Sequence, residues 1–103
     1  MPKVSIIDYG IGNMLSVQRA FEHCGADIVI ADSIDKIERA EYLVLPGVGA
    51  FADGMAGLRK YGYIEPIKAY ARHNRPFLGI CLGMQMMLTT GEEFGRHEGL
   101  DLI

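Results

Sequence analysis

Short apolar segments alternate with helical patterns along the 103 residues of this chain, and this alternation limits the possible folds more than any other feature. The expected strands are Val4 to Ile7, Ile28 to Ile30, Tyr42 to Leu45 and Pro76 to Ile80. We expect the last of these to be buried. Strands that are separated by helices pair in parallel, so the pattern predicts an α/β fold of the flavodoxin-like, doubly wound type, with helices on both faces of the sheet.

Helical patterns fill the intervals between these strands. They cover Asn13 to His23, a short stretch from Asp32-Ser33 to Arg39, a segment through Leu58, Glu65 to His73, and Met84 to Thr90. The first helix is expected to pack through Met14, Val17, Phe21 and Cys24, which recur at helical spacing. This spacing places Cys24 in the core. Tyr61, Tyr63 and Tyr70 are expected at helix surfaces.

Composition limits the class of protein. Half of the residues are hydrophobic, 22% are charged and the formal net charge is −3, which favours a packed core and gives no basic face for nucleic acid. No signal peptide or membrane span is recognised, so a cytoplasmic location without membrane contact is expected. Two cysteines are too few for a disulfide scaffold and lack metal-ligand spacing. Neither a metal nor a cofactor is predicted.

The segment Gly79-Ile80-Cys81-Leu82-Gly83 joins an apolar strand to a helix and resembles a nucleophile elbow with sulfur in place of a hydroxyl. A tight strand-to-helix turn crowds the backbone, and glycines at 79 and 83 remove the Cβ atoms that would clash. The turn directs the Cys81 thiol outward, and a helix N-terminus favours the thiolate. The Leu82 amide would form half of an oxyanion hole. A buried structural cysteine between packing glycines is the alternative interpretation.

A second glycine-rich turn, Pro46-Gly47-Val48-Gly49, follows the strand Tyr42 to Leu45. Its backbone amides are candidates for the other half of the oxyanion hole. Consecutive parallel strands end at the same edge of a sheet, so this loop and Cys81 should open onto one crevice. A Pro-Gly turn is also common for purely structural reasons. The pairing of the loop with the cysteine is what favours a site.

Three segments together resemble a known family. They are Ile7-Asp8-Tyr9-Gly10-Ile11-Gly12-Asn13 with Ser16-Val17, then Leu45-Pro46-Gly47-Val48-Gly49-Ala50-Phe51, and Gly79-Ile80-Cys81-Leu82-Gly83-Met84-Gln85. The chain resembles the class I (triad) glutamine amidotransferases, and among them the glutaminase subunits of imidazole glycerol phosphate synthases. The third segment indicates the superfamily, whereas the first two indicate these subunits.

The resemblance implies a role for each matching residue. Cys81 would attack the carboxamide of glutamine to form a thioester and release ammonia. The amides of Leu82, Val48 and Gly49 would hold the oxyanion, the last two after a peptide rearrangement triggered by the partner. Gly49 and Gln85 would also bind glutamine. The resemblance further implies a partner, a barrel-shaped cyclase or synthase subunit that receives the ammonia. Its expected contacts are Gly10, Gly12 and Asn13.

The match is incomplete because the family carries its base and orienting carboxylate in a His-x-Glu segment in the second half of its chain. Residues 1–103 therefore resemble the N-terminal part of a single amidotransferase domain, with about four strands of an incomplete sheet. One edge of that sheet would be bare, which predicts low stability or self-association. The histidines present are His23, His73 and His97. His23 and His73 fit helix ends, whereas His97 would have to fold back to reach Cys81.

Several functional alternatives stay open at this point. A paralogous amidotransferase for sugar amidination in polysaccharide synthesis would share these motifs. A DJ-1-like protein with a redox-reactive cysteine would share the elbow, although the glycine loop and Gln85 argue against it. A non-catalytic interaction fragment would keep the partner-facing surface without the triad. The resemblance favours a glutaminase that supplies ammonia for the synthesis of imidazole glycerol phosphate in histidine biosynthesis.

Overall fold

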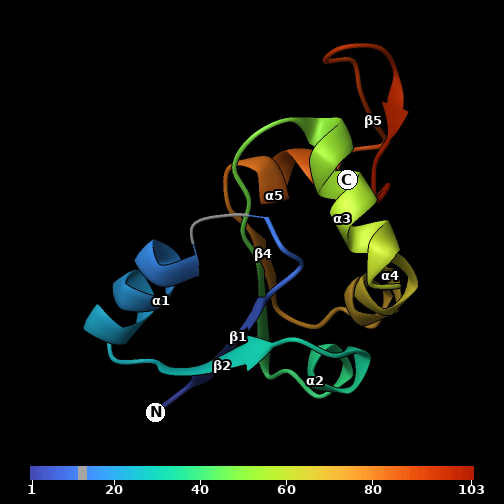
Figure 1. Ribbon diagram of the computed structural model, residues 1–103. Coiled ribbons are helices and arrows are strands. Elements are labelled where there is room, and N and C mark those ends of the chain that lie inside the picture. Colours follow the sequence, from blue (N-terminus) through green and yellow to red (C-terminus); the bar gives the residue numbers. More distant parts are fainter. Residues whose placement is uncertain (12–13) are drawn as a thin grey trace.

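The computed structural model describes residues 1–11 and 14–103 (Figure 1). In this part of the chain, four parallel strands form one sheet in the order β2-β1-β3-β4. Their bounds are β1 Lys3–Ile7, β2 Asp27–Ala31, β3 Tyr42–Leu45 and β4 Phe77–Gly79. The predicted flavodoxin-like sheet is therefore confirmed, because this order matches the start of that fold's strand order. The order reverses between β1 and β3, where folds of this type open a binding crevice at the carboxyl ends of the strands.

Helices cover both faces of the sheet, as Figure 1 shows. The helices are α1 Met14–His23, α2 Ile34–Glu38, α3 Phe51–Lys60, α4 Ile64–Arg72 and α5 Leu82–Met86. Met14, Val17 and Phe21 of α1 pack on Val4, Ile6 and Val44 on one face. The other face carries the larger core, to which α2, α3, α4 and α5 contribute. None of the helices in the described residues is long and apolar enough to cross a bilayer.

The strand β4 corrects the expectation of a buried segment over Pro76 to Ile80. Leu78 is 50% exposed, because β4 pairs with β3 on one side and has no strand on its other side within the described chain. Leu43 donates to the Pro76 carbonyl and Ile80 donates to the Leu45 carbonyl. Parallel pairing uses alternate residues, so the amides and carbonyls of Phe77 and Gly79 face the open edge. The bare edge that we expected is therefore present.

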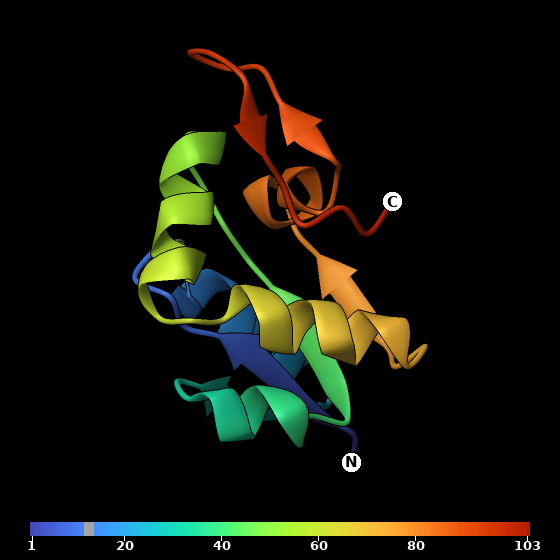
Figure 2. The same cartoon turned by 90° about the vertical axis from the view of Figure 1, so that its right-hand side faces the viewer.

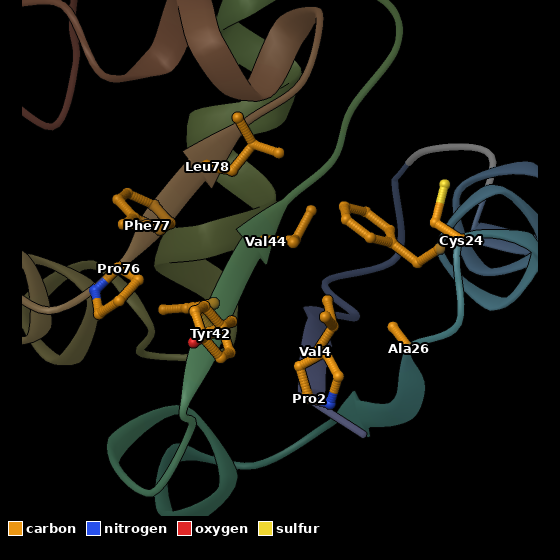
Figure 3. A pocket seen from close by; sticks show the side chains of 11 residues that line it. Pro2, Val4, Cys24, Ala26, Tyr42, Val44, Pro76, Phe77 and Leu78 are labelled. Atoms are coloured by element: carbon orange, nitrogen blue, oxygen red, sulfur yellow. The ribbon is translucent and has the colours of Figure 1, made fainter.

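An apolar groove of about 630 Å³ lies between this edge of the sheet and α1. Figure 3 shows Val44 and Leu78 facing the groove from adjacent strands, with Cys24 at its rim on the α1 side. Cys24 is exposed, so the expectation that it belongs to the core was wrong. It follows the last residue of α1, His23, and so lies beyond the helical residues that pack on the sheet.

The elbow helix is shorter than expected, because α5 ends at Met86 and the continuation to Thr90 was wrong. Leu100 and Leu102 return to this helix end and donate to the Met86 and Met87 carbonyls, at 2.7 and 2.8 Å. Between the end of α5 and Leu100, the chain forms a small antiparallel hairpin of β5 (Thr90–Gly91) and β6 (His97–Glu98). Figure 2 shows the hairpin beyond α5, at the end of the molecule opposite the N-terminus.

Two of the three tyrosines expected at helix surfaces are buried. Tyr63 and Tyr70 are each 3% exposed, whereas Tyr61 is 46% exposed. The Tyr70 hydroxyl lies 3.0 to 3.2 Å from the carbonyl oxygens of Ala40, Glu41 and Pro76. These partners lie just before the N-terminal ends of β3 and β4. Tyr70 therefore joins α4 to the N-terminal ends of these strands, whereas Cys81 lies at their C-terminal ends.

Candidate active site

Cys81 lies at the junction of β4 and α5, with φ 53° and ψ −117°. A residue other than glycine rarely adopts a positive φ, and such strain is typical of a nucleophile at a strand-to-helix elbow. The side chain is exposed. The sealed interior position that the structural alternative required is therefore not observed, and the backbone presents the thiol at the surface.

The two flanking glycines lie where the turn leaves no room for a side chain. A Cβ on Gly79 would lie 2.8 Å from the backbone nitrogen and Cα of Met84. A Cβ on Gly83 would overlap the carbonyl oxygen of Leu45. Backbone atoms cannot move aside as a flexible side chain can, so both positions require glycine. The steric explanation given from the sequence is thus confirmed at Gly79, where the turn itself crowds the position, whereas at Gly83 the crowding comes from the neighbouring strand β3.

The glycine loop after β3 lies against the elbow, as the parallel topology predicted. The Leu82 amide donates to the Gly47 carbonyl at 3.1 Å, and a Cβ on Gly47 would lie 3.0 Å from the Leu82 Cβ. Pro46 and Gly47 are buried, whereas Val48 is 55% exposed. Gly49 has a φ of +103° and open space where a Cβ would stand. The first part of the loop, Pro46-Gly47, is therefore packed against the elbow, whereas Val48-Gly49 is open.

The Leu82 amide, the predicted first oxyanion donor, is engaged in this arrangement. Its hydrogen bond to Gly47 leaves it unable to receive an oxyanion until the Gly47 carbonyl moves. The amides of Val48 and Gly49 have no intramolecular acceptor among the residues that the structure describes. The three predicted oxyanion donors are therefore in neighbouring segments, but the first of them is occupied.

Gln85 follows Cys81 by one helical turn, and its backbone amide donates to the Cys81 backbone carbonyl at 3.2 Å. Its side chain is exposed and borders a cavity of about 200 Å³ that Phe51 and Glu93 also line. Gln85 thus stands on the elbow helix near an open space. Its expected contact with glutamine stays a prediction.

None of the three histidines hydrogen-bonds to Cys81 in the described part of the chain. His23 ends α1, and the His73 Nδ1 lies 2.7 Å from the Ala69 carbonyl oxygen at the end of α4. The His97 Nε2 lies 3.3 Å from the Phe94 carbonyl oxygen, inside its own hairpin. The helix-end placements of His23 and His73 are confirmed, and no base is assembled here from residues 1–11 and 14–103.

The turn after β1 carries the residues expected to meet a partner. Gly10 is exposed with a φ of +83°, and its amide donates to Asp8 Oδ1 at 3.3 Å. Gly12 and Asn13 lie outside the described residues. The partner contact at this turn stays a prediction.

Two residues beside the site were missed from the sequence. Tyr9 is 1% exposed, and its hydroxyl donates to the Pro46 carbonyl. Burial raises the pKa of the Tyr9 hydroxyl, which therefore stays protonated as a donor at neutral pH. Glu93 accepts from the Phe51 amide at 3.2 Å and so caps α3. Both contacts join residues about forty positions apart, and no local pattern signals them.

Comparison with known proteins identifies the family. The model of "Glutamine amidotransferase class-I" matches residues 5–98. The chain belongs to the class I glutamine amidotransferases. This membership confirms the resemblance that the three motifs gave, and the amidotransferase match includes the elbow, the glycine loop and most of β1.

Two bacterial relatives of this amidotransferase chain are similar over all of its 103 residues. It is 60% identical to "Imidazole glycerol phosphate synthase subunit HisH 1" of Legionella pneumophila (strain Paris) and covers 48% of that protein. It is 50% identical to "Imidazole glycerol phosphate synthase subunit HisH" of Geobacter sulfurreducens and covers 49% of it. The chain thus spans about half the length of these curated relatives.

A solved structure supports the fold of the amidotransferase chain. The crystal structure of a putative peptidase E protein from Listeria monocytogenes EGD-e has a TM-score of 0.75 at 12% sequence identity. The alignment covers 99% of this chain and 63% of the other. At this identity, the likeness concerns the fold alone.

Proposed function

We propose that the full-length protein is a glutaminase that hydrolyses glutamine at Cys81 and passes the ammonia to a synthase subunit that makes imidazole glycerol phosphate in histidine biosynthesis. The observation that carries this proposal is the exposed Cys81 thiol on a strained elbow, with the glycine loop of β3 beside it. Family membership and the names of the two relatives support the same reaction. The two free cysteines fit a reducing, cytoplasmic compartment.

The chemistry divides into two steps at one sulfur atom. The Cys81 thiolate attacks the side-chain carboxamide carbon of glutamine, and the C–N bond breaks as the nitrogen takes up a proton and leaves as ammonia. Water then attacks the resulting thioester, which releases glutamate and restores the thiol. Both tetrahedral intermediates carry negative charge on oxygen, for which backbone amides at Leu82, Val48 and Gly49 are the proposed donors.

This reaction also requires a free oxyanion position and a base. The Gly47 carbonyl must leave the Leu82 amide, and we propose that a rearrangement of the Val48-Gly49 peptides accompanies this when the partner binds. A base must take the thiol proton, and we propose that a His-x-Glu segment elsewhere in the longer protein supplies it. The barrel-shaped synthase subunit is the proposed partner, with its contact at Gly10, Gly12 and Asn13.

The decisive experiment measures glutamate release by the full-length protein with and without the synthase subunit. We expect turnover that rises when the subunit is added and disappears in Cys81→Ala. No turnover in either condition would contradict the proposal and leave the interaction interpretation. Supplying a sugar-amidinating partner in place of the synthase subunit tests the paralogous acceptor.

A labelling experiment separates amidotransfer from a redox role, and Cys24 is its internal control. Both cysteines are exposed, so iodoacetamide should modify both, whereas an electrophilic glutamine analogue should modify Cys81 alone. Mass spectrometry of the two cysteine-containing peptides gives the ratio of Cys81 to Cys24 modification. Glutamine should protect Cys81 from iodoacetamide and leave Cys24 unaffected. Ready peroxide oxidation of Cys81 without such protection would indicate redox sensing instead.

A further inference from the structure

Tyr9 connects the end of β1 to the glycine loop from inside the molecule. Its hydroxyl donates to the Pro46 carbonyl, 37 residues later, and its ring packs so closely that a Cβ on Gly57 would lie 3.1 Å from Tyr9 Cδ2. A Cβ on Gly47 would lie 2.5 Å from the Tyr9 hydroxyl oxygen. The side chain is therefore fixed between α3 and the loop, and it lies against the backbone that carries the proposed oxyanion donors.

Consecutive carbonyls of this loop are held by two different elements. Tyr9 holds the Pro46 carbonyl, and the Leu82 amide holds the Gly47 carbonyl at 3.1 Å. The two carbonyls belong to adjacent peptide groups: the Tyr9 bond holds the Pro46-Gly47 peptide, from which the Gly47-Val48 peptide extends, and rotation of the latter breaks the bond to Leu82. The Tyr9 hydroxyl therefore fixes the orientation from which the Gly47 carbonyl occupies the Leu82 amide.

We propose that Tyr9 is a positioning residue that keeps the Gly47 carbonyl on the Leu82 amide and so holds the oxyanion position closed. The proposal rests on the proposed glutaminase function and names the contact that regulates that site. In this proposal the Tyr9–Pro46 bond is made in the closed arrangement and breaks when the Gly47 carbonyl leaves Leu82, so removal of the Tyr9 hydroxyl raises the free energy of the closed arrangement relative to an open one. Tyr9→Phe then increases the fraction of molecules in which Leu82 is free.

The test uses Tyr9→Phe in the full-length protein and Tyr70→Phe as its matched control. Both tyrosines are buried, at 1% and 3% exposure, and both hydroxyls contact backbone carbonyls, but Tyr70 lies at the N-terminal ends of β3 and β4. Each substitution removes one oxygen and keeps the ring. A general loss of stability affects both variants, whereas a change at the glycine loop affects only the first.

Two readouts are taken without the synthase subunit. The first is the kcat for glutamine hydrolysis, for which we expect a rise of roughly three- to tenfold in Tyr9→Phe, the factor that corresponds to one hydrogen bond. The KM should change less than kcat, because the loop controls the oxyanion and not the glutamine side chain. The second is hydrogen exchange in the peptide that contains Leu82, which should become faster by a similar factor. Tyr70→Phe should change neither quantity.

The readouts also separate failure of this proposal from failure of the proposed function. Unchanged exchange at Leu82 in Tyr9→Phe overturns the positioning role, and so does an equal change in Tyr70→Phe. A basal kcat that falls or stays constant while Cys81-dependent turnover persists overturns it as well. If the wild-type protein hydrolyses no glutamine even with the synthase subunit, the proposed function fails, and the exchange comparison still decides whether Tyr9 holds Gly47 on Leu82.

Discussion

Gly83 packs against the carbonyl oxygen of Leu45 so closely that a Cβ at position 83 would overlap that oxygen. The contact joins the first turn of α5 to the last residue of β3, and the Ile80 amide donates to the same carbonyl at 3.0 Å. The elbow and the glycine loop are thus set against each other by backbone atoms alone. A side chain at this position forces one of the two segments to move.

We expect Gly83→Ala to lower the free energy of unfolding by about 3 kcal/mol or more, because the overlapped atom belongs to the backbone of a central strand. Urea denaturation of the full-length protein measures the loss. Met84→Ala is the control, since Met84 is 54% exposed on the same helix, and it should cost less than about 0.5 kcal/mol. A Gly83→Ala protein as stable as the wild type would show that the contact is looser than described.

Glu93 should stabilise the N-terminus of α3 from a distance in sequence. Its carboxylate accepts from the Phe51 amide, and no side chain of the N-cap residue, Ala50, provides that cap. We expect Glu93→Ala to cost about 0.5 to 1 kcal/mol and to speed hydrogen exchange at Phe51. The neighbouring exposed carboxylate offers a control, so Glu92→Ala should change neither value. Equal effects of the two substitutions would assign the contribution to net charge.

The parts of the fold that the sequence predicted are those with local causes. The strand Tyr42–Leu45 was located to the residue, because an apolar run ends there at a Pro-Gly turn. The elbow followed from Gly79 and Gly83, of which Gly79 is crowded locally by Met84, whereas Gly83 is crowded by Leu45 of β3. The meeting of Gly47 with Leu82 followed from topology, since parallel strands end at one edge of the sheet.

The parts that escaped prediction depend on contacts between distant segments. Nothing near Tyr70 in the sequence indicates that carbonyls at Ala40 and Glu41 would surround its hydroxyl. The methionine-rich run after Cys81 continues a helical pattern, but α5 ends at Met86, whose carbonyl accepts from the amide of the distant Leu100. The burial of Tyr9 has the same character. Side-chain hydroxyls that satisfy remote carbonyls leave no periodic signal.

The open edge of β4 predicts self-association of the 103-residue chain. Leu78 exposes half of its surface beside the outward amides of Phe77 and Gly79, and such an edge pairs readily with another strand. We expect concentration-dependent oligomers in sedimentation velocity and a clear reduction in Leu78→Glu. Leu15→Glu is the matched control, because Leu15 is 53% exposed on the helix α1 and not on a strand. A monomeric chain that melts cooperatively would contradict this expectation.

Alkaline pH should destabilise the protein through its buried tyrosines. Burial raises the pKa of Tyr9, and it also raises that of Tyr70 against an opposing effect of Arg75. An unfolded tyrosine titrates near pH 10, roughly, so the unfolded chain releases its protons first and deprotonation favours unfolding. The stabilisation is complete below that pH and is lost as the pH rises towards the folded-state pKa.

Urea midpoints between about pH 8 and pH 11 measure this loss. The slope of stability against pH should be shallower in Tyr9→Phe, by up to about 1.4 kcal/mol per pH unit. Tyr61→Phe is the comparison, because the Tyr61 ring is 46% exposed, and it should leave the slope unchanged. Parallel curves for Tyr9→Phe and the wild type would mean that the Tyr9 hydroxyl ionises equally in both states.

The strained backbone of Cys81 should lower the stability of the fold. Two substitutions distinguish the effect of backbone strain from the effect of the thiol. A residue with a side chain at φ 53° is strained, whereas glycine adopts this region freely. Cys81→Gly should therefore raise the free energy of unfolding by about 1 kcal/mol, while Cys81→Ala keeps the strain and gives no gain. Both variants lack the thiol and should release no ammonia from glutamine. Equal stabilities in urea denaturation would show that the elbow relaxes when the sulfur is removed, and the strain would then belong to the thiol's own contacts.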